Sequence, residues 1–184
     1  MECSYIFLAT GFEEIEALAT VDVLRRGGMD VKLVSIHDEP IVAGAHGIVV
    51  TADTIMADTD FTNAEWLICP GGLPGSENLY NHDPLAELLQ AHNAAGKQIA
   101  AICAAPALVL ARLGILAGKR ATCYPGFGSV LAECGANPLQ QHVVIDGNTT
   151  TGNGPASAAP FALAIVEQSK GADVAKAVAD GMLC

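Results

Sequence analysis

The amino-acid sequence predicts an α/β protein with a doubly wound, mainly parallel sheet and helices on both faces, arranged as a three-layer sandwich. Segments typical of buried strands alternate with helical segments along the whole chain of 184 residues. Such alternation favours a parallel sheet that is covered on both sides. Apolar residues make up 51% of the chain and aromatic residues only 5%, a mixture typical of tightly layered α/β proteins. No linker-like stretch divides the sequence, so we expect a single domain over residues 1–184.

The first half of the chain begins with a strand and a helix. Ser4–Ala9 reads as a buried strand, and Glu13–Arg26 reads as a helix that Gly27 and Gly28 end. The first turn of this helix is acidic and its last turn is basic, as expected at helix ends. The apolar face of the helix contains Ile15, Leu18, Val21 and Leu24. Further strands are predicted at Val31–Ile36, Ile48–Val50 and Trp66–Cys69, and a further helix at Pro84–Ala95.

The second half repeats the alternation. Gln98–Ile102 is a predicted strand, and the chain becomes helical from Ala105 onwards. Short strands are predicted at Ala121–Cys123, His142–Asp146 and Thr149–Thr151, and helices at Pro155–Ser169 and Asp173–Asp180. Ligands of such sheets bind beyond the carboxyl ends of the strands. The residues predicted to gather there are Cys69, Gly71, Gly72, Cys103 and Gly152–Gly154.

Charge and hydropathy exclude several classes of partner. The formal net charge is −11, with nine basic residues against twenty acidic ones, which disfavours binding to nucleic acid and to anionic membranes. The longest uncharged apolar run, Ile99–Ala111, is interrupted by Pro106 and is too short to span a membrane. The first basic residue is Arg25, so we expect no secretory signal and a cytoplasmic location.

The six cysteines are expected to be free thiols. No two of them have CxxC spacing, and no neighbouring histidine completes a zinc pattern. Without a secretory signal, a reducing compartment is expected, where disulfides are rare. We therefore expect neither a disulfide framework nor a metal site.

Cys103 lies where a buried strand passes into a helix. Unpaired N–H groups at a helix N-terminus favour the thiolate, and a sharp strand-to-helix turn presents a side chain as nucleophile elbows do. The position therefore suits a reactive nucleophile. It also suits a small buried thiol that only fills the core.

Three carboxylates, those of Glu13, Glu14 and Glu16, crowd the first turn of the first predicted helix. They either complement the helix dipole on a solvated face or include a group with a chemical role. Glu16 is the candidate for such a role, because it lies close to the apolar edge of the helix. A carboxyl in apolar surroundings has a raised pKa and can donate or accept a proton.

Two glycine-rich loops follow predicted strands. The loop Pro70–Gly75, PGGLPG, is a tight turn, an anion cradle or an oxyanion hole that uses the amide of Gly72. It matches neither GxGxxG nor GxxxxGK[ST], so nothing specific supports a nucleotide-binding module. In the second loop, Thr150–Ser157, Asn153 or Ser157 either caps the following helix, which is the favoured role, or contacts a ligand. The histidines are scattered, and none is adjacent to Cys103 in the sequence.

Five stretches carry a family resemblance in this order: GFEEIEALATVDVLRRGG, PGGLPGSENL, QIAAICAAPALVLA, GNGPASA and FALAIVE. Together they resemble the ThiJ/PfpI superfamily, in its DJ-one/YajL-like branch, over nearly the whole chain. The resemblance implies a flavodoxin-like sandwich that forms a homodimer. It implies that Cys103 is a reactive cysteine at a strained elbow and that Glu16 is a buried, protonated glutamate bonded to its sulfur. The backbone amides of Gly71, Gly72 and Ala104 would lie beside that sulfur.

Members of this superfamily are described as cofactor-independent glyoxalases, as protein deglycases or as redox-regulated chaperones. The preferred hypothesis is an enzyme of stress protection that converts small reactive carbonyls, such as methylglyoxal, to hydroxy acids. Cys103 would be its nucleophile and Glu16 its acid and base, with no metal or other cofactor. The alternative is an oxidation-sensing redox or chaperone protein whose Cys103 is converted to sulfinic acid.

Three candidate pocket residues depart from the pattern of the superfamily. Tyr124 stands where relatives have the histidine of a T-x-H-P stretch, and His46 and Asn153 align with arginines. A mechanism that needs that histidine, or an anion-binding pair beside the cysteine, is therefore weakened. Ala104 follows Cys103 where the peptidase branch has a histidine, which disfavours proteolysis.

Overall fold

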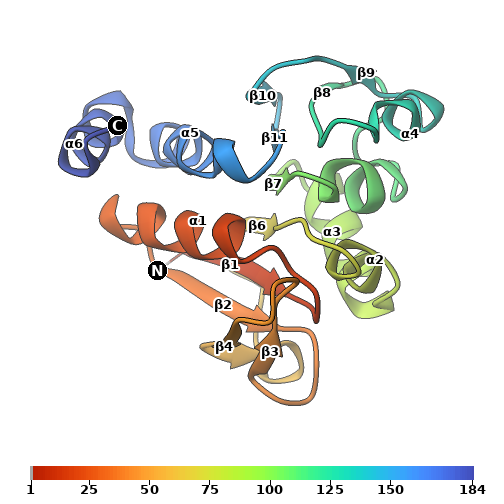
Figure 1. Ribbon diagram of the computed structural model, residues 1–184, viewed down its shortest axis with the longest axis horizontal. Helices are drawn as coiled ribbons and strands as arrows, with labels where there is room; N and C mark the ends of the chain where they lie inside the picture. The colour runs from red at the N-terminus through yellow and green to blue at the C-terminus, as the bar shows by residue number, and fades with distance from the viewer. Residues whose placement is uncertain (1) are drawn as a thin grey trace.

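A computed structural model of the protein describes residues 2–184, and its central feature is a seven-stranded sheet (Figure 1). The strands of this sheet are β1 (Cys3–Leu8), β2 (Val31–Ser35), β5 (Thr54–Ile55), β6 (Ala64–Cys69), β7 (Gln98–Ile102), β10 (Val143–Asp146) and β11 (Thr149–Gly152). Their order across the sheet is β10-β11-β7-β6-β1-β2-β5. Only β10 runs antiparallel to its neighbour among these strands.

Helices cover both faces of the sheet. They are α1 (Glu14–Arg26), α2 (Gly75–Tyr80), α3 (Asp83–Ala94), a π-helix (Pro106–Ala111), α4 (Gly128–Glu133), α5 (Ala158–Lys170) and α6 (Ala172–Met182), with 3₁₀ turns at Met56–Asp58 and Pro155–Ser157. Helices α1, α5 and α6 lie together on one face, and α2, α3, α4 and the π-helix lie on the other (Figure 1).

The central strands are apolar on both faces because each face has its own core. In β1, Ile6 and Leu8 pack toward α1 and α5, whereas Tyr5 and Phe7 pack toward the opposite layer of helices. Strands buried on both sides read as continuous apolar runs rather than as alternating ones. The predicted doubly wound, flavodoxin-like three-layer sandwich is confirmed.

Two predicted strands belong to small sheets outside the main one. The strand predicted at Ile48–Val50 is β4 (Val49–Thr51), which pairs with β3 (Ile41–Ala43) in a separate hairpin. The strand predicted at Ala121–Cys123 is β8 (Arg120–Ala121), which pairs with β9 (Asn137–Pro138). Strand signals in the sequence report residue type and not the pairing partner, so they could not separate these strands from the main sheet.

The prediction that Ile15 lies on the buried face of the first helix is wrong, because this side chain is 58% exposed. The helix instead buries Glu16, Ala17 and Thr20, which look less apolar in the sequence. Among the histidines, His92 lies in the predicted helix and is buried on α3. Helices α2 and α4 were not predicted, since each is too short to show a helical period.

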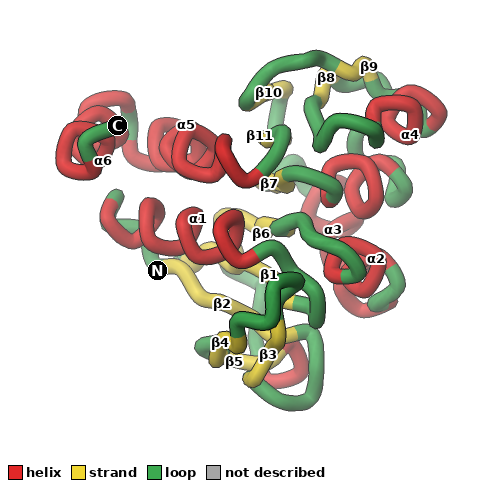
Figure 2. The backbone as a smooth tube through the Cα atoms, viewed as in Figure 1, coloured by secondary structure: helices red, strands yellow, loops and turns green. Residues whose placement is uncertain are grey.

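The carboxyl ends of β1, β6 and β7 meet at one edge of the sheet, and their loops leave on the same side (Figure 2). This edge brings the start of α1, the loop after Cys69 and the turn after Ile102 together. The predicted gathering of strand-end residues is therefore seen. No helix among residues 2–184 has the length and apolar character that crossing a bilayer requires.

Candidate active site

Cys103 occupies a strained turn between β7 and the π-helix. Its φ is +66°, a left-handed conformation that costs a residue other than glycine roughly 1–3 kcal/mol. Two backbone hydrogen bonds hold it there: its N–H donates to Gly152 at 2.9 Å, and its carbonyl accepts from the Tyr124 N–H at 2.7 Å. Only 8% of the residue is exposed. The elbow geometry that the resemblance implies is thus present at this position.

Glu16 is fully buried in the first turn of α1. Its Oε2 accepts a hydrogen bond from the Gly71 N–H at 2.8 Å, while its Oε1 has no partner among the described residues. Burial raises the pKa of Glu16 to about 7, although hydrogen bonds from Cys103 and from Gly71 oppose this rise. A buried carboxyl with an unpartnered oxygen is therefore poised to hold a proton near neutral pH.

The prediction that the helix N-terminus lowers the pKa of Cys103 is wrong, because the groups around the thiol raise this pKa. Burial raises the pKa of the Cys103 thiol, and the negative charge of an ionised Glu16 raises it further. The amides of Ala104 and Gly72 act in the opposite direction. When Glu16 is protonated, it no longer repels a negative charge on the sulfur, and its carboxyl can donate a hydrogen bond. The thiolate therefore depends on protonated Glu16 more than on a helix dipole, and the short π-helix supplies little of one.

Gly71 and Gly72 have different roles in the backbone of this site. A methyl group at Gly71 would meet the Cys103 Cβ at 2.6 Å and the Glu16 Oε2 at 2.7 Å, so there is room only for glycine. The Gly71 amide is bonded to Glu16 and does not face the sulfur, in contrast to what the resemblance implies. The amides of Gly72 and Ala104 are the ones that interact with Cys103. Gly72 has a φ of +91°, which a side chain would strain.

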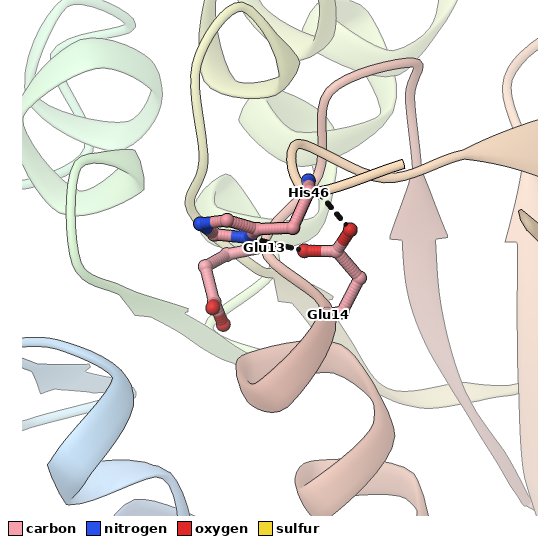
Figure 3. A group of neighbouring side chains, drawn as sticks. All are labelled: Glu13, Glu14 and His46. Carbon is pink, nitrogen blue, oxygen red and sulfur yellow. Dashed lines mark hydrogen bonds and ion pairs between the residues drawn. The ribbon is translucent and has the colours of Figure 1, made fainter. Parts of the chain in front are cut away.

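His46 pairs with a glutamate at the start of α1 (Figure 3). Its Nδ1 lies 2.8 Å from Glu14 Oε2, and its amide donates to Glu14 Oε1 at 2.7 Å. Burial opposes ionisation of Glu14, but hydrogen bonds from His46 outweigh it and lower the pKa of this carboxyl. The same hydrogen bond raises the pKa of His46. Glu14 therefore holds the loop between β3 and β4 against the start of α1.

Glu13 lies close to this pair but serves the helix. Ligand atoms of Glu13, Glu14 and His46 lie within 4.8 Å of one another. Figure 3 shows the Glu13 carboxylate turned away from His46, and its Oε2 accepts from the Glu16 N–H at 2.7 Å. It caps the helix and so fixes the first turn, on which Glu16 stands.

Asn153 does not cap a helix, and neither does Ser157. No side-chain cap hydrogen bond is formed at Pro155–Ser157 or at the start of α5, and the Ser157 hydroxyl instead donates to Asn153 Oδ1 at 2.6 Å. Tyr124 is 46% exposed, and it lies over Gly154 and beside the Cys103 carbonyl. Asn153 and Tyr124 thus flank the elbow at Cys103.

His142 is a neighbour of the elbow that sequence reasoning did not single out. It is exposed, and its carbonyl accepts from the Asn153 N–H at 3.0 Å. It precedes β10, and the antiparallel course of β10 brings this residue to the carboxyl end of β7 and β11. Recognising β10 and β11 as a hairpin was the signal that could have found it.

Comparisons with known proteins show which family the chain belongs to. Residues 4–168 match the model of the DJ-1/PfpI family. Protein DJ-1alpha of Drosophila melanogaster is 39% identical over 180 residues, which cover 97% of this chain and 82% of that protein. A Caenorhabditis elegans protein named glutathione-independent glyoxalase DJR-1.2 is 38% identical, covering 86% of this chain and 83% of its own.

A solved structure and two plant proteins are also similar to this chain. The structure of oxidized Toxoplasma gondii DJ-1 matches with a TM-score of 0.94 and 34% identity, covering 100% of this chain and 98% of that one. Protein DJ-1 homolog B of Arabidopsis thaliana is 42% identical over 91% of this chain. This chain spans less than half of the length of the two Arabidopsis relatives, at 38% and 45%. Since the family match covers residues 4–168 and several relatives exceed 30% identity, the chain belongs to the DJ-1/PfpI family.

Proposed function

We propose that this protein is a cofactor-independent enzyme that converts small α-oxoaldehydes, such as methylglyoxal, to 2-hydroxy acids with Cys103 as nucleophile. One observation supports this above all others: the Cys103 thiol is held at a strained elbow beside the buried Glu16 carboxyl, whose pKa is about 7. The printed name of the Caenorhabditis elegans relative, a glutathione-independent glyoxalase, favours the same chemistry. Deglycase-like action would extend it to carbonyl adducts of proteins.

The first step forms a covalent bond to the substrate. Glu16 takes the proton of the Cys103 thiol, and the thiolate adds to the aldehyde carbon. The electron pair of the C=O bond moves to oxygen, and this oxygen receives the proton back from Glu16. The product is a neutral hemithioacetal. The amides of Gly72 and Ala104 are the donors placed to stabilise negative charge beside the sulfur.

The second step moves hydrogen between adjacent carbons. Ionised Glu16 removes the proton from the carbon bonded to sulfur, and the electron pair moves to the ketone oxygen as an enediolate. Glu16 returns its proton to the neighbouring carbon, and the hydroxyl proton of the hemithioacetal passes to the enediolate oxygen. This gives a thioester of the 2-hydroxy acid. Water then cleaves the thioester and restores the thiol, so one aldehyde and one water yield one hydroxy acid without an external oxidant.

The direct test is lactate formation from methylglyoxal by the purified protein, in buffer that contains a chelator and no glutathione. Turnover that saturates with substrate and scales with protein concentration is the expected result. Lactate formation no faster than in buffer would contradict the proposal. In that case a redox role would account for the site better.

A redox-sensing role is the second candidate, because the unpartnered Oε1 of Glu16 could donate a hydrogen bond to a sulfinate on Cys103. The relative from Toxoplasma gondii was solved in an oxidized form. We expect graded peroxide to oxidise Cys103 before Cys69, because peroxide can reach Cys103, which is 8% exposed at the elbow, whereas Cys69 is fully buried in β6. Intact-mass and peptide mass spectrometry measure this order. Equal oxidation of the two cysteines would count against a sensor.

We also propose that the protein is a homodimer located in the cytoplasm, where thiols stay reduced. Three exposed apolar side chains, Ile15, Ile48 and Val49, belong to the start of α1 and the β3–β4 hairpin. Glu14 joins these two segments, because it precedes Ile15 and accepts hydrogen bonds from the amides of His46 and Ile48. Large apolar side chains that gather on one surface mark an interaction site.

Replacing Val49 with glutamate is expected to raise the dimer dissociation constant by at least about 100-fold, because it buries a charge in an apolar interface. Sedimentation velocity over a dilution series measures this effect. Ile145→Glu is the matched control, because Ile145 is an exposed apolar residue on β10, at the other end of the sheet. Loss of the dimer in both variants, or a monomeric wild type, would argue against this interface.

A further inference from the structure

A pocket of about 530 Å³ lies beside the elbow and has no part in the chemistry described above. Its walls include Tyr124, Gly128, Leu131, Leu139, His142 and Asn153. Pockets that hold small molecules measure roughly 300–1,000 Å³ and combine apolar walls with a few directed polar groups. Methylglyoxal is too small to occupy such a space while its aldehyde carbon is bonded to Cys103.

The register of the sheet connects this pocket to the reacting sulfur. Val143, Gly152 and Ile102 lie opposite one another on β10, β11 and β7. His142, Asn153 and Cys103 therefore form the next row, just beyond the strand ends. Adjacent strands are about 4.8 Å apart, so the backbone of His142 lies about 10 Å from that of Cys103. Cys103 does not line the pocket itself.

Tyr124 forms the wall between the pocket and the elbow. Its N–H donates to the Cys103 carbonyl at 2.7 Å, and the residue also lines the pocket. Asn153 is the second shared residue, since it follows Gly152, whose carbonyl accepts from the Cys103 N–H. A ligand that reaches from the sulfur past these two residues would enter the pocket.

The hydrogen bonds of His142 determine which of its ring nitrogens is free. Ser157 donates its only hydroxyl hydrogen to Asn153 Oδ1 at 2.6 Å. The Ser157 oxygen can then only accept from His142 Nδ1, which lies 2.9 Å away. Neutral His142 therefore carries its hydrogen on Nδ1. The Nε2 atom is left as a hydrogen-bond acceptor on a residue that lines the pocket.

We propose that this pocket binds the non-reacting body of an aryl α-oxoaldehyde while the aldehyde carbon of the same molecule bonds to Cys103. The inference rests on the proposed function, which it deepens by naming a substrate class. Leu139 and the ring of Tyr124 supply apolar contact for the aryl group, and His142 Nε2 accepts from a ring hydroxyl. The net charge of −11 favours such a neutral substrate over an anionic one. The reaction stays balanced, because one aryl α-oxoaldehyde and one water give one aryl 2-hydroxy acid.

Gly128→Phe tests the pocket by filling it. A Cβ atom at Gly128 would meet no atom within 4 Å, and the residue lines the pocket, so the variant is expected to fold. Gly181→Phe is the matched control, because Gly181 is equally open and lies on α6 outside this pocket. The measurement is the ratio of kcat/KM for phenylglyoxal to kcat/KM for methylglyoxal. We expect Gly128→Phe to lower this ratio at least 10-fold and Gly181→Phe to leave it unchanged.

A binding measurement makes the inference testable without turnover. The inert ketone 2-hydroxyacetophenone is titrated into the Cys103→Ser protein and followed by NMR, with 2-hydroxy-4′-hydroxyacetophenone in parallel. Gly128→Phe on this background is expected to weaken both at least 10-fold. His142→Phe is expected to weaken only the phenol, because it removes the acceptor and keeps the bulk.

The two proposals fail in different ways. Absence of turnover with both aldehydes, together with ketone binding that Gly128→Phe abolishes, would overturn the proposed enzyme but retain the pocket as an aryl-binding site. Turnover of both aldehydes with an unchanged ratio in Gly128→Phe would overturn the pocket assignment alone. Ketone binding that is unaffected by Gly128→Phe would also overturn it.

Discussion

Replacing Cys103 with serine is expected to lower lactate formation from methylglyoxal by at least about 10³-fold, because it removes the covalent nucleophile of the proposed reaction. A hydroxyl in this position is not ionised by a carboxyl whose pKa is about 7. The hemithioacetal therefore has no counterpart in the variant. Lactate is measured enzymatically after single time points with wild type and variant side by side.

Cys134→Ser is the matched control for this substitution. Cys134 is also a free cysteine and is partly buried, but it lies after α4 and outside the elbow. Its replacement is expected to keep turnover within a factor of two of wild type. Full activity of Cys103→Ser, or equal loss in the two variants, would remove Cys103 from the mechanism. Circular dichroism of both variants separates loss of chemistry from loss of fold.

Replacing Glu16 with glutamine is expected to lower kcat by about 10²–10⁴-fold, the usual contribution of a positioned acid and base. Glutamine retains the shape of the side chain and the acceptor for the Gly71 N–H. It cannot take the proton from the thiol or move it between the substrate carbons. Unchanged kcat in this variant would assign the proton transfers to another group.

The same variant is expected to change the pH dependence of stability. Glu16 holds a proton in the folded state up to about pH 7, whereas in the unfolded chain it releases this proton near its ordinary pKa of 4.5. The folded state then binds more protons, so the free energy of unfolding falls as pH rises from about 4.5 to about 7. Glutamine does not titrate and lacks this fall, which amounts to about 3 kcal/mol.

Urea denaturation of wild type and Glu16→Gln between pH 4.5 and pH 8 measures this difference. The other titrating groups are common to both proteins, so their contributions cancel in the comparison. The stability of the variant relative to wild type should rise through this range and level off above pH 7. A constant difference would mean that Glu16 is ionised in the folded protein throughout.

The buried strands and long helices were predictable because their signals are local. Continuous apolar runs located β1, β6 and β7, and the acidic first turn and terminal glycines located α1. The DJ-1/PfpI pattern singles out Cys103 and Glu16 from the sequence alone. The pairing of strands was harder to predict from the sequence. The hairpin of β3 and β4 has strand-like residues, but only tertiary contacts place it outside the main sheet.

The sequence by itself determined the fold class and the position of Cys103 at a strand-to-helix joint, and it predicted Glu16 as the candidate acid and base among three neighbouring glutamates. Only the tertiary structure decided the balance that controls their protons. Burial raises the pKa of both groups, and their pairing makes the thiolate depend on the proton of Glu16. Tertiary structure also brought His142 beside the elbow through strand register. Burial and register depend on segments far apart in the chain, whereas sequence patterns report near neighbours.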